Sequence, residues 1–154
     1  MLIVNKIGKP IDYDVFLSAW GTLFQRFENT MLAGNFPGGF RKDYGLVITD
    51  ATGGMKLVRL MRRMAVFNYI PHDPRYGPGS RNIPIKRMIE DPHPKNSADA
   101  LPIQMADVAA YFLYQRFAPN SFIVTKRADS YFDRLEPVLN KSARPRDRLG
   151  VVML

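Results

Sequence analysis

Two aspartates occupy the positions of this chain that best suit chemistry on a phosphate. Asp50 follows the apolar, β-branched run of residues 44–49 and precedes a loop of small residues, where open α/β sheets place ligands. Asp107 stands in the middle of an otherwise apolar predicted helix, where burying an unpaired carboxylate is costly. Two carboxylates are a minimal site for Mg²⁺ or Mn²⁺. The pair predicts metal-dependent chemistry, although a turn role for Asp50 and an exposed helix face around Asp107 stay open.

Gln104 and Ser97 are the polar residues expected to assist these aspartates. Gln104 lies one turn before Asp107, so the two side chains share a helix face. Ser97 has no credible base beside it, so we interpret it as a helix N-cap or as a hydroxyl that orients ligands. The sequence has no cysteine, which excludes disulfide frameworks, thiolate nucleophiles and zinc ribbons.

The positive charge of the sequence is concentrated. The formal net charge is +8, and nine Lys and Arg residues stand against three acids between Lys56 and Lys95. A second basic cluster occupies residues 141–148. Such concentration is typical of a nucleic-acid-binding surface, with a solvated helix face as the alternative. We expect the nucleic-acid contacts to come from Lys56, Arg59, Arg62, Arg63, Arg75, Arg81, Lys86 and Arg87.

The elements that must position these residues alternate between strand and helix. The hydrophobic pattern predicts strands at 2–7, 44–49 and 85–90, and helices from Asp12 or Asp14 to Met31, at 55–69, at 101–117 and at 128–139. The last helix should bend or break at Pro137, and the proline-rich residues 71–84 should form a long loop. This alternation is typical of an α/β protein.

The length of 154 residues fits a single domain, 1–154. The longest apolar run, Val108–Tyr114, is far shorter than a membrane span, and the first residues do not form a secretory signal. We therefore expect a cytoplasmic protein without membrane contact.

Several stretches share the pattern of one known family. They are Gly45–Asp50, Leu60–Met64, Asn68–Pro71, Ile89–Pro92, Asp147–Val152 and, most specifically, Ile103–Tyr111 with its Gln-x-Ala-Asp sequence. Together they resemble the second half of the bacterial and phage family called domain of unknown function 3800, and residues 1–43 are similar to the segment before it. The resemblance implies an α/β, ribonuclease-H-like mixed sheet with flanking helices. It also implies phosphodiester cleavage with Mg²⁺ or Mn²⁺ held by Asp50 and Asp107.

The chain departs from that family at three places. It lacks the strand with an Asp-Glu-Ser-Gly motif, Asn96 replaces an acid, and Ala100 replaces a serine. An N-terminally truncated sheet would leave a strand edge that a second copy of the chain could cover.

Three functions are therefore open at the level of the sequence. One is a metal-dependent nuclease of a phage, mobile element or defence locus, with Asp50, Asp107, Gln104 and Ser97 as its site. Another is a catalytically inactive nucleic-acid-binding or interaction module of the same fold. The third is a structural domain whose missing strand another chain supplies.

Overall fold

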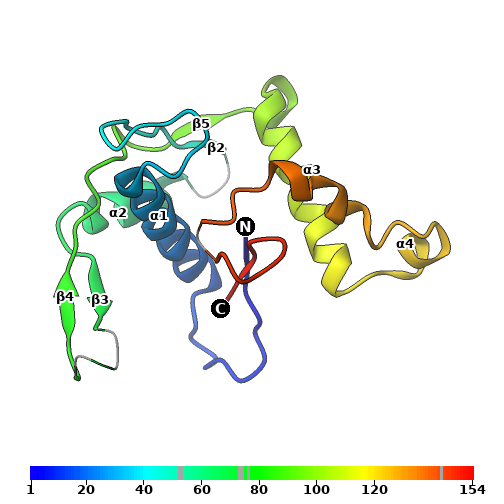
Figure 1. Cartoon of the computed structure of the whole chain (residues 1–154), viewed down its shortest axis with the longest axis horizontal. Helices are drawn as coiled ribbons and strands as arrows, with labels where there is room; N and C mark the ends of the chain where they lie inside the picture. Colours follow the sequence, from blue (N-terminus) through cyan, green and yellow to red (C-terminus); the bar gives the residue numbers. More distant parts are fainter. Residues whose placement is uncertain (52–53, 73–74, 76, 143) are drawn as a thin grey trace. The chain divides into compact units, whose positions relative to one another are not determined.

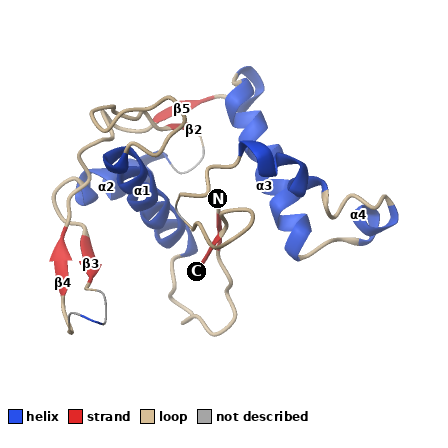
Figure 2. Cartoon of the chain, viewed as in Figure 1, coloured by secondary structure: helices blue, strands red, loops and turns tan. Residues whose placement is uncertain are grey.

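The computed structural model describes residues 1–51, 54–72, 75, 77–142 and 144–154 (Figure 1). It divides into two compact units, unit 1 with Met1–Asn5 and Lys95–Leu154, and unit 2 with Lys6–Pro94. Helices and strands both contribute (Figure 2), so the mixed helix-and-strand class predicted from the sequence is confirmed. Within the described ranges the strands form three two-stranded sheets, β1–β6, β2–β5 and β3–β4. The single domain expected from the length stays a prediction.

Two packed helices form the centre of unit 2. α1 (Val15–Ala33) begins as predicted, because the Asp14 carboxylate accepts a hydrogen bond of 2.9 Å from the backbone N–H of Leu17. α2 (Gly54–Met64) places its apolar side against α1. Their common core consists of Phe24, Leu57, Leu60, Met61, Met64 and Ile85, with Trp20 packed against it. α2 ends five residues before the predicted boundary, and Tyr69 belongs to a strand.

A β-hairpin follows α2 in the region predicted as an irregular loop. β3 (Tyr69–Pro71) pairs in antiparallel register with β4 (Ser80–Asn82). The expectation of no regular structure in residues 71–84 was therefore wrong at both ends of that range. Pro71 is tolerated because it closes a strand of a two-stranded sheet, and Gly77 and Gly79 adopt positive φ angles of 89° and 130° in the connection.

The predicted strand at 85–90 is replaced by a shorter one further along the chain. Met88 forms an isolated bridge with Gly45, and the strand itself is β5 (His93–Lys95), which pairs with β2 (Ile48–Asp50). The cause is Glu28 of α1, whose carboxylate accepts the N–H groups of Lys86 at 2.9 Å and Arg87 at 2.8 Å. Those two N–H groups are therefore not available to a strand ladder.

Unit 1 is built around α3 (Leu101–Phe117), whose bounds match the prediction. β1 (Leu2–Ile3) is shorter than the predicted strand at 2–7 and pairs in parallel with β6 (Val152–Met153). The short 3₁₀ helix η2 (Ser97–Asp99) precedes α3, and the unpredicted α4 (Ser121–Thr125) follows it.

The predicted last helix of unit 1 takes a tighter form. At residues 128–139 the chain forms the 3₁₀ helix η3 (Tyr131–Val138), in which Pro137 cannot donate a backbone hydrogen bond. Phe132 of η3 is fully buried and packs with Leu113 of α3 and with Leu149 and Val151 near the end of the chain. This cluster is the core of unit 1.

Candidate functional site

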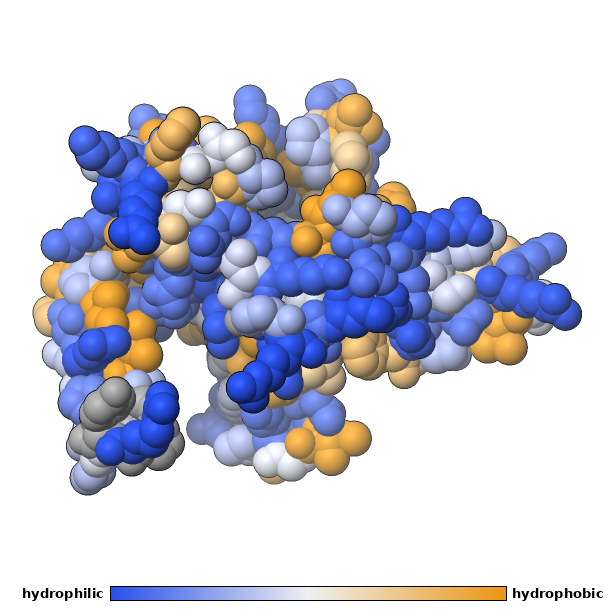
Figure 3. All heavy atoms as spheres, viewed as in Figure 1, coloured by the Kyte–Doolittle hydropathy of each residue, from blue (hydrophilic) through white to orange (hydrophobic). Residues whose placement is uncertain are grey.

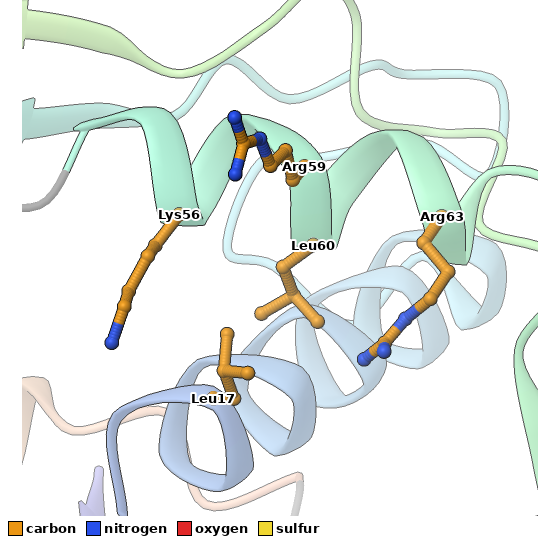
Figure 4. Close-up of a pocket in the computed structure, with 5 residues that line it drawn as sticks. All are labelled: Leu17, Lys56, Arg59, Leu60 and Arg63. Carbon is orange, nitrogen blue, oxygen red and sulfur yellow. The ribbon is translucent and has the colours of Figure 1, made fainter. Parts of the chain in front are cut away.

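One side of α2 carries three basic residues above a hollow. Lys56, Arg59 and Arg63 line a depression of about 270 Å³ whose apolar floor is Leu17 of α1 and Leu60 of α2. Figure 4 shows Lys56 and Arg63 on either side of the two leucines, with Arg59 leaving the helix between them. The spacing of three and then four residues places all three side chains on one side of the helix. We call Lys56, Arg59 and Arg63 the α2 cationic face.

The charges of the α2 cationic face are largely uncompensated. Within the ranges that the structure describes, Arg59 and Arg63 form no ion pair with an acidic side chain. Lys56 Nζ lies 3.9 Å from Asp14 Oδ2, and both side chains are exposed, so the interaction is weak. Two guanidinium groups, each able to bind a phosphate through two hydrogen bonds, therefore face solvent.

Arg62, predicted to belong to the same interface, is already occupied. Its Nε donates a hydrogen bond of 2.9 Å to Asp91 Oδ1, and its Nη2 also contacts that carboxylate. The hydrogen bond from Arg62, together with its charge, lowers the pKa of Asp91 below its usual range. Arg62 therefore differs from Arg59 and Arg63 on the same helix, because its guanidinium group already has an acidic partner.

The remaining predicted cations lie in the hairpin region and beside a second hollow. Arg75 and Arg81 are exposed, Arg81 within β4. Lys86 and Arg87 line a depression of about 450 Å³ together with Tyr44. The Arg87 guanidinium stands 5.1 Å from the centre of the Tyr44 ring, and its Nη1 donates to the backbone oxygen of Lys42 at 3.2 Å.

The structure brings Gln104 and Ser97 together, but through the backbone. Gln104 Nε2 donates to the carbonyl oxygens of Ser97 at 2.8 Å and Ala98 at 3.0 Å. The N-cap of η2 is Asn96, whose Oδ1 accepts the N–H of Ala98 at 3.1 Å, and the N-cap of α3 is Ala100. The expectation that Ser97 caps a helix was therefore wrong; its hydroxyl as an orienting group stays a prediction.

Asp50 and Asp107 are both exposed, and they belong to different units. Asp50 ends β2 in unit 2, whereas Asp107 lies on α3 in unit 1. Neither unit by itself assembles the two-carboxylate site predicted for Mg²⁺ or Mn²⁺. Among the described residues there is also no group of three or more His, Cys, Asp or Glu side chains that could hold a metal ion. The Mg²⁺ or Mn²⁺ site formed by Asp50 and Asp107 therefore stays a prediction, and we derive no catalytic step from it.

Glu28 and Tyr44 were missed at the sequence level, although each has a recognisable signal. Glu28 stands between Phe24 and Met31 in the apolar stripe of α1 and is 1% exposed. A carboxylate within an apolar stripe is a recognisable signal, because a buried acid needs hydrogen-bond donors around it. Tyr44 precedes β2 and is 59% exposed. Its aromatic ring is therefore available for contacts with a ligand.

Comparison with known proteins identified no relative of this chain. The chain matches no protein-family model, no curated protein and no solved structure. None of the described helices is long and apolar enough to cross a membrane. The functional assignment therefore rests on the side chains of the two units.

Proposed function

We propose that unit 2 binds the phosphate backbone of a nucleic acid through the α2 cationic face. The observation that carries this proposal is that Arg59 and Arg63 have no acidic partner among the described residues. Unpaired guanidinium groups attract phosphate, and counterions released from the nucleic acid add to the affinity. The apolar floor between the cations keeps their stems ordered and their charged ends in water.

The length of the face favours a polynucleotide over a single phosphate group. Lys56 and Arg63 are seven residues apart on α2, about 10 Å along the helix axis, a distance over which one strand of a duplex carries about three phosphates. Arg81 in the adjacent hairpin and Lys86 beside the second hollow extend the positive potential of unit 2. A single phosphate group would span only part of this row.

The ribonuclease-H-like class is part of the proposal. It is supported by the order of the elements: β2 ends in Asp50, the basic α2 follows it, and α3 carries the Gln-x-Ala-Asp motif.

Binding as a function of salt is the direct test. We expect the affinity for a fluorescently labelled duplex or single strand to fall steeply as salt rises. The variant Arg59→Ala/Arg63→Ala should lose about ten-fold in affinity at low salt, and the slope of log K against log salt should fall by about 1.4 to 1.8. Fluorescence anisotropy measures both quantities.

The matched control removes two arginines that already have acidic partners. Arg116→Ala/Arg148→Ala makes the same change in net charge, but Asp133 and Glu136 hold those guanidinium groups. Its affinity and salt slope should equal those of the unmodified chain. Equal losses in the two double variants would show that net charge alone, and not the α2 cationic face, governs binding.

A nuclease is the second candidate, favoured by the exposed Asp107 one turn after the anchored Gln104 on α3. It is tested by incubating labelled DNA and RNA with the chain and Mg²⁺ or Mn²⁺. We expect Asp107→Asn to abolish cleavage while leaving binding at the α2 cationic face unchanged. Equal cleavage by Asp107→Asn and the unmodified chain would remove Asp107 from the site.

A further inference from the structure

Two exposed aromatic rings stand immediately after α2. Phe67 and Tyr69 are 57% and 64% exposed, and their ring planes are inclined by only 8° with the centroids 6.5 Å apart. Exposed hydrophobic side chains occur elsewhere on the surface, as the orange atoms among blue ones in Figure 3 illustrate, and singly they need no explanation. Two nearly parallel rings beside a cationic row are a more specific arrangement.

The aromatic pair continues the line of the α2 cationic face. The backbone N–H of Phe67 donates to the carbonyl oxygen of Arg63 at 2.6 Å, which is the connection of one helical turn. Lys56, Arg59, Arg63 and Phe67 therefore follow one another at steps of three or four residues. Tyr69, the first residue of β3, adds the second ring. The cations of α2 and the two aromatic rings thus follow one another along the chain within one unit.

The residue between the two rings is held firmly. Asn68 is buried, and its backbone N–H donates to Asn82 Oδ1 at 2.7 Å. Its side-chain amide donates to the carbonyl oxygen of Ile83 at 2.7 Å and to Gln25, and its own carbonyl accepts the N–H of Ile83 at 2.8 Å.

Asn82 secures the same segment from the other strand of the hairpin. Its Nδ2 donates to the carbonyl oxygen of Val66 at 2.8 Å, directly before Phe67. The backbone on both sides of each ring is therefore fixed before any ligand arrives, which reduces the entropy lost on binding.

We propose that the Phe67–Tyr69 pair stacks on the bases of a single-stranded nucleic acid whose phosphates lie on the α2 cationic face. The proposal rests on the function proposed above and names its substrate class. Bases of a duplex are stacked on one another and do not offer their faces, whereas those of a single strand do. Rings next to a row of cations are the combination by which proteins bind single strands without strong sequence preference.

The test separates charge from stacking with two probes of the same length and charge. One is a labelled oligo-dT of about 10 nucleotides, within the range that one such site covers, and the other is its abasic counterpart. We expect the full chain to bind oligo-dT more tightly than the abasic strand. In Phe67→Ala/Tyr69→Ala this preference should fall by about five-fold or more, while the affinity for the abasic strand stays unchanged.

Three further variants make the result specific. Phe67→Tyr/Tyr69→Phe keeps both rings and should retain the preference for oligo-dT. Phe40→Ala removes a phenylalanine that is 74% exposed in the same unit and should leave both affinities unchanged. Arg59→Ala/Arg63→Ala should weaken binding of both probes alike.

The outcomes distinguish the two proposals. Equal affinity of the unmodified chain for both probes, with a steep salt dependence, would overturn the stacking proposal and leave the α2 cationic face in place. Tighter binding of a duplex than of oligo-dT would also overturn it. No binding of either probe or of a duplex would overturn the proposed function itself, and the stacking proposal with it.

Discussion

The two basic regions of this chain look alike in sequence and differ in what their charges do. In unit 1, Lys141 and Arg148 of the second basic cluster contact Asp133 or Glu136, as does Arg116 of α3. Arg144 and Arg146 of that cluster form no ion pair among the described residues. On the α2 cationic face of unit 2, Arg59 and Arg63 have no such partner in the described part of the chain. The number of basic residues in a segment therefore gives its positive charge. The positions of the acidic side chains in the folded protein determine how much of that charge is available to a ligand.

The acids of the two units explain this difference. Asp133 and Glu136 of unit 1 point at cations, and Arg148 bridges them. In unit 2 the buried acid Glu28 instead accepts two backbone N–H groups, and Asp91 pairs with Arg62. Unit 2 is thus left with uncompensated positive charge on its surface.

The largest expected effect comes from removing the buried acid. Glu28→Ala should lower the free energy of unfolding by about 3 kcal/mol, because two buried backbone N–H groups lose a charged acceptor. Glu28→Gln, which keeps one acceptor oxygen, should lose about half as much. Chemical denaturation followed by circular dichroism measures both. The control is Glu90→Ala, at an exposed acid paired with His93, whose free energy of unfolding should stay within about 0.5 kcal/mol of that of the unmodified chain. An equally small effect of Glu28→Ala would contradict the role of Glu28 as acceptor of the two backbone N–H groups.

A smaller effect should follow from freeing the paired arginine of α2. Asp91→Asn removes the partner of Arg62, so we expect the affinity for nucleic acid to rise about three-fold at low salt and the salt slope to steepen by about 0.7 to 0.9. Glu90→Gln makes the same change in net charge at the neighbouring residue and should have a smaller effect. If the two variants bind equally well, Arg62 does not join the α2 cationic face when released.

The smallest effect concerns the ion pairs of unit 1 and appears only in acid. The hydrogen bond from Lys141 lowers the pKa of Glu136, with Arg148 acting in the same direction. Burial raises the pKa of Asp133, but hydrogen bonds from Arg148 and Arg116 outweigh it and the net pKa is lowered. A lowered pKa in the folded state gives stability that is present above the unfolded value near about 4 and is lost as the pH falls through the folded value.

The measurement is the melting temperature between about pH 6 and about pH 3. Asp133→Asn/Glu136→Gln should show a flatter acid branch than the unmodified chain, because the two carboxylates no longer take up protons. Asp129→Asn, at an exposed acid of the same unit, should leave the acid branch as it is. An unchanged curve in the double variant would place the acid sensitivity elsewhere.

Prediction from the sequence succeeded for elements held by local interactions. The Asp14 cap and the bounds of α3 depend on residues within a turn or two of each other. The local sequence pattern is therefore sufficient to predict them. It failed where a distant residue supplied the hydrogen bonds. The strand expected at 85–90 is prevented by Glu28, and the hairpin of β3 and β4 pairs Tyr69 with Asn82 across a proline-rich connection. The short strands that did form depend on pairing across the chain, which no local pattern specifies.

The sequence by itself determined where the basic residues lie and that Lys56, Arg59 and Arg63 share one side of a helix, because helical spacing is a local rule. The tertiary structure alone decided that Arg62 is paired, since its partner Asp91 lies 29 residues further along the chain. Arg59 and Arg63 have no acidic partner among the residues that the structure describes. It also decided that Phe67 and Tyr69 flank a buried Asn68, whose hydrogen-bond partners come from α1 and the hairpin. Charge and aromaticity are properties of residues, whereas their availability to a ligand depends on what folding brings beside them.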